Sequence, residues 1–293
     1  MNVVKGTLKY TCDVLGFIFR SFEPLEVRAT EPWVEKVVVE CRNETPLEVT
    51  VTFASAPSAE TALISGRVIC RTIVGRLALQ YGLCVQEPFL AAQDLEEDKD
   101  GRTTKVVAGG APMVCNGKDS QKISPQDLPG LKVELEDQRP NRQNYEELYR
   151  IAMQAVDNVD RYMSLYRILS LLCPNAQGKE VQKCVDDFIE QQTKEKRHFK
   201  RPDKTSVLET VYTRLRNEVG HARPGVDLAH TRREMDGRVY ELAAVVKKAI
   251  EIKTSNRLAE KHDSAADVVS CGLLRPKTQQ AGSGAASRID TTV

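Results

Sequence analysis

Residues 145–172 read YEELYRIAMQAVDNVDRYMSLYRILSLL, and this stretch decides the fold of the C-terminal half of the chain. Its apolar residues recur at steps of three and four, which places them on one face of a helix. They are Tyr145, Leu148, Ala152, Ala155, Val159, Tyr162, Tyr166, Leu169 and Leu172. The pattern predicts one long amphipathic helix that ends before Pro174, because the residue before a proline disfavours the helical conformation.

Three further amphipathic helices are predicted downstream. A short one is marked by apolar residues at 181, 185 and 188. The next two begin with the capping boxes Ser206-x-x-Glu209 and Thr231-x-x-Glu234, in which two side chains bind free backbone amides. Their apolar stripes are Val207, Val211, Leu215 and Val219, then Met235, Val239, Leu242, Val246 and Ala249. Because the connections are short, the four helices are expected to pack as antiparallel neighbours.

The first part of the chain mixes strand and helix signals. Apolar and polar residues alternate from 47 to 53, which is typical of a half-buried strand, and the valine run 37–39 predicts a strand paired with it as a hairpin. A helix is predicted after Pro57-Ser58 and is expected to end at Gly82. Alternation from 131 to 136 predicts one more strand.

These signals predict an α+β protein with an N-terminal β-containing domain and a C-terminal antiparallel four-helix domain. We expect a mixed α/β domain at residues 1–137, the helical domain at 138–256 and a disordered tail at 257–293, where periodicity stops and small polar residues follow. The charged, glycine-rich stretch 94–122 is expected to be an irregular loop. A sensing or regulatory role for the N-terminal domain is suggested by architecture alone.

Composition bounds the class of protein. The 293 residues are 41% hydrophobic and 28% charged with a net charge of +1, which neither requires nor excludes a nucleic-acid partner. The eight cysteines form no CxxC pair and have no zinc-ligand spacing, so reduced thiols in a cytoplasmic protein are expected. No apolar run approaches the roughly 20 residues of a membrane span, and we expect no membrane association.

The segment Arg216-Asn217-Glu218-Val219-Gly220-His221 is the candidate functional site. Arginine matches phosphate oxygens with its planar fork, histidine moves protons near neutral pH, and asparagine can orient either of them. His221 can meet Asn217 on one helix face, or it can swing out of the last turn at Gly220. Metal-free cleavage of an RNA phosphodiester needs a base, an acid and a cation, so two copies across a dimer axis would make the more complete site.

An arginine–asparagine pair followed by a histidine, late in the penultimate helix of a four-helix unit, resembles the R-x4–6-H motif of the HEPN superfamily. The long helix with YMSLYR at 162–167 resembles the first helix of such domains. The resemblance covers about residues 140–255 and not the N-terminal part.

The resemblance implies a homodimer whose motifs face each other. Many HEPN proteins are metal-independent endoribonucleases, often in toxin–antitoxin or antiviral defence systems, while others are inactive or bind nucleotides. Carried over by position, Arg216 would contact the scissile phosphate of RNA, His221 would be the acid/base and Asn217 would support them. No cofactor is implied, and a protein regulator is a possible partner.

The connector 193–204 holds the densest basic run of the chain. Its candidate RNA-binding residues are Lys196, Arg197, Phe199, Lys200 and Arg201. The cations would hold phosphates and the phenyl ring would stack on a base, whereas charge runs between helices are also commonly plain solvated loops.

Alternatives to a ribonuclease remain open at this point. Arg216 and His221 can simply cap a helix end, where cations are favourable. The helical domain can then be a non-catalytic dimerisation or partner-binding module, or the chain can be an accessory protein of a metabolic pathway. No metal site is expected: Glu96, Asp98 and Asp100 imitate an EF-hand, but Val107 stands where the loop needs a glutamate.

Overall fold

The computed structural model describes residues 3–15, 22–41, 46–99, 102–109, 128–137, 139, 142–202, 206–221 and 225–270, with the side chains of all but 15, 99, 102–109 and 256–270. The chain divides into two compact units, residues 1–255 and 256–293. The first unit holds an N-terminal antiparallel sheet followed by helices, so the expected α+β class is confirmed at this level.

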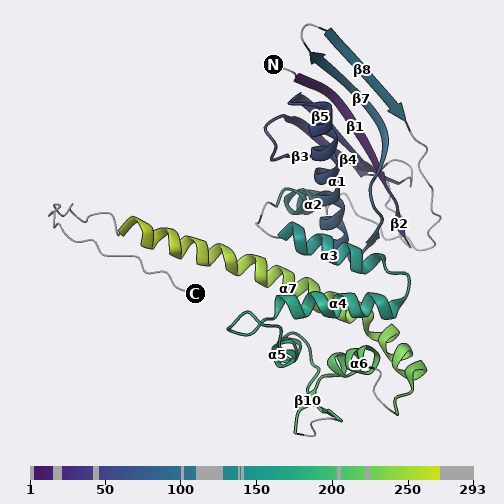
Figure 1. The fold of residues 1–293 in the computed structure, drawn as a ribbon, viewed down its shortest axis with the longest axis vertical. Coiled ribbons are helices and arrows are strands. Elements are labelled where there is room, and N and C mark those ends of the chain that lie inside the picture. Colours follow the sequence, from purple (N-terminus) through teal and green to yellow (C-terminus); the bar gives the residue numbers. More distant parts are fainter. Residues whose placement is uncertain are drawn as a thin grey trace, which may run out of the picture. The chain divides into compact units, whose positions relative to one another are not determined.

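Six strands of the described part form one antiparallel sheet in the order β3-β4-β5-β1-β7-β8 (Figure 1). They are β1 (Val3–Cys12), β3 (Phe22–Val27), β4 (Val34–Cys41), β5 (Leu47–Ala56), β7 (Phe89–Lys99) and β8 (Arg102–Gly109). A short pair of β2 (Val14–Leu15) and β6 (Cys84–Val85) lies outside this sheet.

The predicted hairpin is confirmed in β4 and β5. Val37 pairs with Val51 and Val39 with Val49, so the apolar residues of both strands share one face. The alternating Leu47, Val49, Val51 and Phe53 are buried, while the polar residues between them are partly exposed. A shift of one residue would reverse both faces, and the alternation therefore specifies the register.

Helix α1 (Ala59–Tyr81) packs on the apolar face of the sheet (Figure 1). The Ser58 hydroxyl accepts a hydrogen bond from the Thr61 amide at its start. The helix ends at Gly82, whose φ of 66° lies in the left-handed region that glycine adopts without a steric cost. The predicted end of this helix is confirmed.

The strand predicted at 131–136 is wrong, since these residues belong to helix α2 (Leu128–Leu135). Leu131 and Leu135 are buried, whereas Val133 between them is 70% exposed. Residues four apart share a helix face, so the short alternating run fitted both periods and packing against α1 decided between them.

The irregular loop predicted at 94–122 is also wrong in its first part. Residues 94–99 continue β7, and β8 follows as its hairpin partner. β7 pairs along β1, and Leu95 is buried there while its charged neighbours stay on the polar side. The sheet's backbone hydrogen bonds therefore override the charged, loop-like composition; residues 110–122 lie outside the described part.

Five helices of the described part follow α2. They are α3 (Arg142–Gln154), α4 (Asn158–Leu172), α5 (Gln182–Gln192), α6 (Val211–Gly220) and α7 (Leu228–Ser270). A two-stranded pair of β9 (Phe199–Lys200) and β10 (Leu208–Glu209) lies between α5 and α6. The short helix predicted around 181–188 is confirmed by α5.

The single long helix predicted from 145 to 172 is interrupted. α3 ends at Gln154, and Asp157 starts α4 by accepting a hydrogen bond from the Val159 amide. Val156 at the break is 96% exposed. The apolar period continues through the break, but an aspartate cap competes with the helix interior for the same backbone amides.

Both predicted capping boxes are wrong. α6 begins only at Val211 with Thr210 as its cap, because Leu208 and Glu209 pair as a strand with β9. α7 begins at Leu228, where the Asp227 carboxylate accepts hydrogen bonds from the amides of Ala229 and His230. The patterns were present, but residues 208–209 form strand β10, and α7 begins before Thr231 at the Asp227 cap.

α7 contains the predicted stripe from Met235 to Ala249, which is buried as expected. It continues to Ser270, past residue 257 where the tail was expected to begin, and residues 271–293 lie outside the described part. No helix in the described ranges has the length and apolarity that crossing a membrane requires.

The buried apolar residues of the first unit gather into two clusters. One joins the sheet with α1 and α2, and the other joins α3 to α7, together with Leu79 of α1. Between them, the Glu146 carboxylate contacts the guanidinium groups of Arg142 and Arg76 at 2.7 and 3.5 Å, and all three residues are buried. Sheet and helices thus share one compact unit, and the division at 137–138 stays a prediction.

Replacing Gly6 by alanine tests the packing of β1 on β7. Gly6 has φ of 135° at a register shift in β1, and a Cβ there would lie 2.0 Å from the Asp94 carbonyl oxygen. We expect Gly6→Ala to lower the free energy of unfolding by at least about 3 kcal/mol, measured by urea denaturation.

Gly178→Ala is the matched control. Gly178 has φ of 75°, but a Cβ there meets nothing within 4 Å. It should lose only the conformational cost of roughly 1–2 kcal/mol. Equal losses in the two variants would show that the contact with Asp94 has no importance.

Candidate functional site

Helix α6 is held in place by a buried carboxylate on the neighbouring helix. Asp186 of α5 accepts hydrogen bonds from the hydroxyls of Thr210 and Thr213, both at 2.6 Å, and from the Thr210 amide at 3.2 Å. The Tyr166 hydroxyl of α4 lies 2.8 Å from the Thr213 hydroxyl. Three helices therefore meet at the start of α6, and its last turn carries the candidate site.

The structure brings Arg216 and His221 together. The Arg216 Nη1 atom lies 3.1 Å from His221 Nε2, and the His221 backbone amide donates to the Asn217 carbonyl at 3.1 Å. The helix persists to Gly220, and the exposed imidazole turns towards the arginine rather than towards the Asn217 side chain. The Arg216 guanidinium also lies 5.7 Å from the centre of the Tyr166 ring.

This contact defines the state of the histidine. A guanidinium group only donates hydrogen bonds, so His221 Nε2 must accept and the ring proton must sit on Nδ1. The exposed ring therefore places its Nε2 atom next to a permanent positive charge. Such a pair can bind an anionic oxygen and take up a proton beside it.

Asn217 lies beneath this pair and is 2% exposed. Its Oδ1 accepts a hydrogen bond from Arg216 Nη1 at 2.8 Å, and its Nδ2 donates to Glu209 Oε1 at 3.0 Å and to Gln182 Oε1 at 3.3 Å. Glu209 has no exposed surface and also accepts from Gln182 Nε2 at 3.2 Å. The amide of Asn217 is thus fixed by acceptors on one end and a donor on the other.

The basic connector meets the site at Glu209, where Phe199 pairs with it as a strand and Arg201 contacts its carboxylate. Arg201 Nε lies 3.4 Å from Glu209 Oε1, which links the connector to Asn217. Arg197 is instead paired with Asp187 and Glu190 at 2.5 and 2.6 Å, and these carboxylates raise its pKa.

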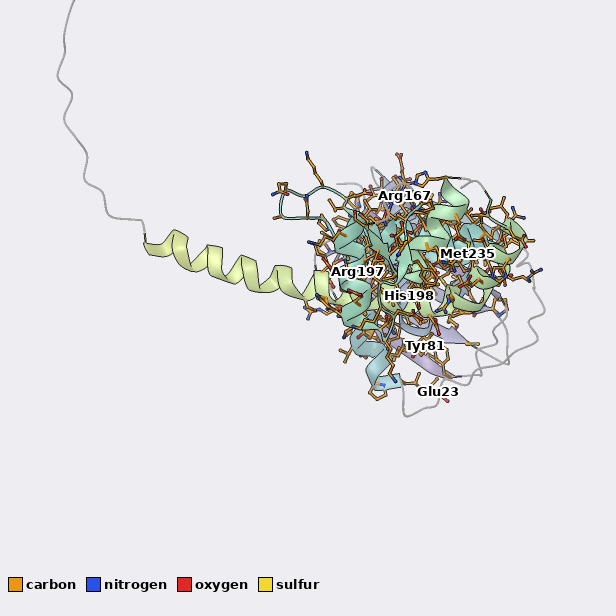
Figure 2. The ribbon with its side chains drawn as sticks, turned by 90° about the horizontal axis from the view of Figure 1, so that it is seen from below. Glu23, Tyr81, Arg167, Arg197, His198 and Met235 are labelled. Atoms are coloured by element: carbon orange, nitrogen blue, oxygen red, sulfur yellow. The ribbon has the colours of Figure 1, made fainter. Side chains whose placement is uncertain are left out.

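The remaining connector residues differ in their surroundings. Phe199 is partly buried against the helical core, with the Arg214 guanidinium 4.5 Å above its ring and His198 beside it. Lys196 and Lys200 are exposed. Figure 2 marks Arg197 and His198 in this segment. RNA contact by this group stays a prediction.

Sequence reasoning missed the buried polar residues that support the site. Glu209 was assigned to a capping box, and Gln182 and Asp186 went unnoticed although they lie four apart on α5 beside its apolar residues. This four-residue spacing beside the apolar face indicated that both side chains could be buried. Nothing in the sequence indicated that α5 and α6 would place Gln182, Glu209 and Asn217 within hydrogen-bonding distance.

The described part of the chain was also compared with the ligand sets that bind metal ions. No group of three or more histidine, cysteine, aspartate or glutamate side chains there could hold a metal ion. The polar atoms that the site offers to a ligand are the guanidinium group of Arg216 and the imidazole of His221, a combination suited to a phosphate.

Comparison with known proteins gives one result. A family model described as methylamine utilization protein MauJ matches residues 145–252, which is most of the helical part and under half of the chain. The match includes α4, α5, α6 and the site, and it does not reach the sheet. Neither the curated proteins nor the solved structures contain a significant match.

Asp186 offers a test of how α6 is held. Burial raises the pKa of its carboxyl despite the threonine hydrogen bonds, so protonation is more favourable in the folded protein than in the unfolded chain. Asp186→Asn keeps an oxygen for the same donors and removes the buried charge. We expect it to change the free energy of unfolding by less than about 1 kcal/mol, whereas Asp186→Ala should cost about 2–4 kcal/mol.

The raised pKa of Asp186 also predicts how the free energy of unfolding changes with pH. A raised folded-state pKa contributes stability that is full below the unfolded value of about 3.9 and is lost as pH rises through the folded value. The stability of Asp186→Asn relative to wild type should therefore increase across that window and then level off. Urea denaturation at a series of pH values measures this, and a constant difference would contradict it.

Proposed function

We propose that residues 138–256 form a HEPN-like helical module and that the chain acts as a homodimeric, metal-independent endoribonuclease. The contact of 3.1 Å between Arg216 Nη1 and His221 Nε2 carries this proposal. In it, α3 and α4 together take the place of the first helix, with α5, α6 and the first part of α7 completing the four. A cytoplasmic role in stress or antiviral defence is the biological setting that the resemblance suggests.

The geometry supports transfer at phosphorus without a metal. Arg216 would turn its donor from His221 Nε2 to a non-bridging phosphate oxygen, which frees the Nε2 lone pair. His221 Nε2 would then take the proton of the ribose 2′-hydroxyl as that oxygen attacks phosphorus. The bond from phosphorus to the 5′-oxygen breaks, and this oxygen takes a proton. The products are a 2′,3′-cyclic phosphate and a 5′-hydroxyl.

A second copy of the chain has a defined task in this scheme. One protomer offers a single histidine at the site, and a base and an acid are both needed. His221 of the second copy, in its protonated form, would supply the proton for the leaving oxygen. The exposed position of His221 at the end of α6 is compatible with such an approach.

Cleavage of RNA in the presence of EDTA tests the proposal. We expect wild-type protein to give 2′,3′-cyclic ends, His221→Ala to lower the rate about 10²–10⁴-fold, and Arg216→Ala about 10²–10³-fold. His230→Ala is the matched control, because His230 is an exposed histidine whose Nε2 atom lies 3.8 Å from the Glu234 carboxylate, outside the site. Equal cleavage by all variants would refute the assignment.

The family match favours a second candidate, a non-catalytic accessory protein for the use of methylamine. In that case the helical part would bind a protein partner, and His221 would only cap α6. A strain without the gene would then grow poorly on methylamine and be restored equally by wild type and by His221→Ala. Restoration by wild type alone would instead assign the histidine a chemical role.

A further inference from the structure

A buried carboxylate beneath the site has no part in the proposed reaction. Glu209 has no exposed surface, and its Oε1 atom is shared by Gln182, Asn217 and Arg201. Burying a carboxylate is costly unless its partners are well placed, and an amide of the same size would avoid the charge. Its position therefore calls for a role that an amide could not fill.

That role is to set the orientation of the Asn217 side-chain amide. An asparagine can present either its oxygen or its nitrogen to a neighbour, and Arg216 only donates hydrogen bonds. Glu209 Oε1 and Gln182 Oε1 both accept from Asn217 Nδ2, so Oδ1 must face Arg216. If the amide were reversed, it would present a donor to the guanidinium group.

Arg216 connects the oriented Asn217 amide to His221. Its Nη1 atom donates to Asn217 Oδ1 at 2.8 Å and lies 3.1 Å from His221 Nε2. One guanidinium nitrogen therefore joins the buried amide to the exposed imidazole. The series of contacts runs from Glu209 through Asn217 and Arg216 to His221.

We propose that Glu209 is a positioning residue that directs the Asn217 amide and thereby holds His221 in the tautomer with an unprotonated Nε2. Arg201 of the basic connector provides a positive charge next to this carboxylate. The importance of the tautomer for RNA cleavage rests on the proposed function, but the positioning itself does not.

The tautomer can be measured directly by ¹⁵N NMR of the histidine side chains. The chain has four histidines, and His221→Ala assigns the signal. At mildly alkaline pH, where a free imidazole is neutral, an unconstrained ring prefers the proton on Nε2. We expect the ring proton of His221 to be on Nδ1 in the wild type. In Glu209→Gln we expect the ring proton to shift towards Nε2, because a glutamine can donate to Asn217 and reverse its amide.

Glu218→Gln is the matched control. Glu218 is a buried glutamate of α6 whose carboxylate binds Arg214 and Thr231 instead of the Asn217 amide. It should keep the wild-type signal at a similar loss of stability. If Glu209→Gln does not fold, Gln182→Met removes a second acceptor of the same amide and should shift the signal in the same direction.

Two results would overturn the proposal: a wild-type His221 with its proton on Nε2, or a Glu209→Gln signal identical to wild type. In the cleavage assay, Glu209→Gln should lower kcat at least tenfold with little change in KM, since the residue touches no substrate. If wild-type protein cleaves no RNA, the endoribonuclease fails, while the NMR comparison still decides whether Glu209 positions His221.

Discussion

The rest of the first unit depends on one buried carboxylate between two guanidinium groups. Glu146 is 1% exposed and lies where α1, the helix that covers the sheet, meets α3, the first helix of the second core. Burial raises the pKa of Glu146 and lowers that of Arg76, and the opposite charges act against both shifts. A cluster of this kind is stable only in one geometry, which favours a defined junction over a sliding apolar contact.

Buried carboxylates also fix the geometry of the candidate site. Asp186 holds the start of α6 through threonine hydroxyls, and Glu209 holds the Asn217 amide near its end. Both carboxylates are buried and hydrogen-bonded, so α6 is fixed at both ends while only its last residues are open to solvent. A half-buried arginine beside an exposed histidine on a rigid support suits the binding or cleavage of a phosphodiester, because the orienting groups are in place before the ligand arrives.

Local patterns predicted those elements whose signals agreed with their packing. The alternation around Val49 and Val51 gave the correct strands, and Gly82 ended α1 as expected, because burial and backbone geometry supported the same answer. The pattern around Val133 misled because a run of six alternating residues also fits a helix. The two capping boxes failed because residues 208–209 pair as strand β10 and because α7 begins earlier, at the Asp227 cap.

The sequence by itself determined the helical character of the second half, which follows from the apolar period, and placed Arg216 and His221 five residues apart at the end of α6. Only the tertiary structure decided which way the Asn217 amide points and that Arg216 lies between this amide and His221. Those choices depend on Gln182 and Glu209, which come from separate elements that no local pattern relates to α6. A hydrogen bond between distant residues is specified by the packing of whole elements, and the chemistry of the site follows from it.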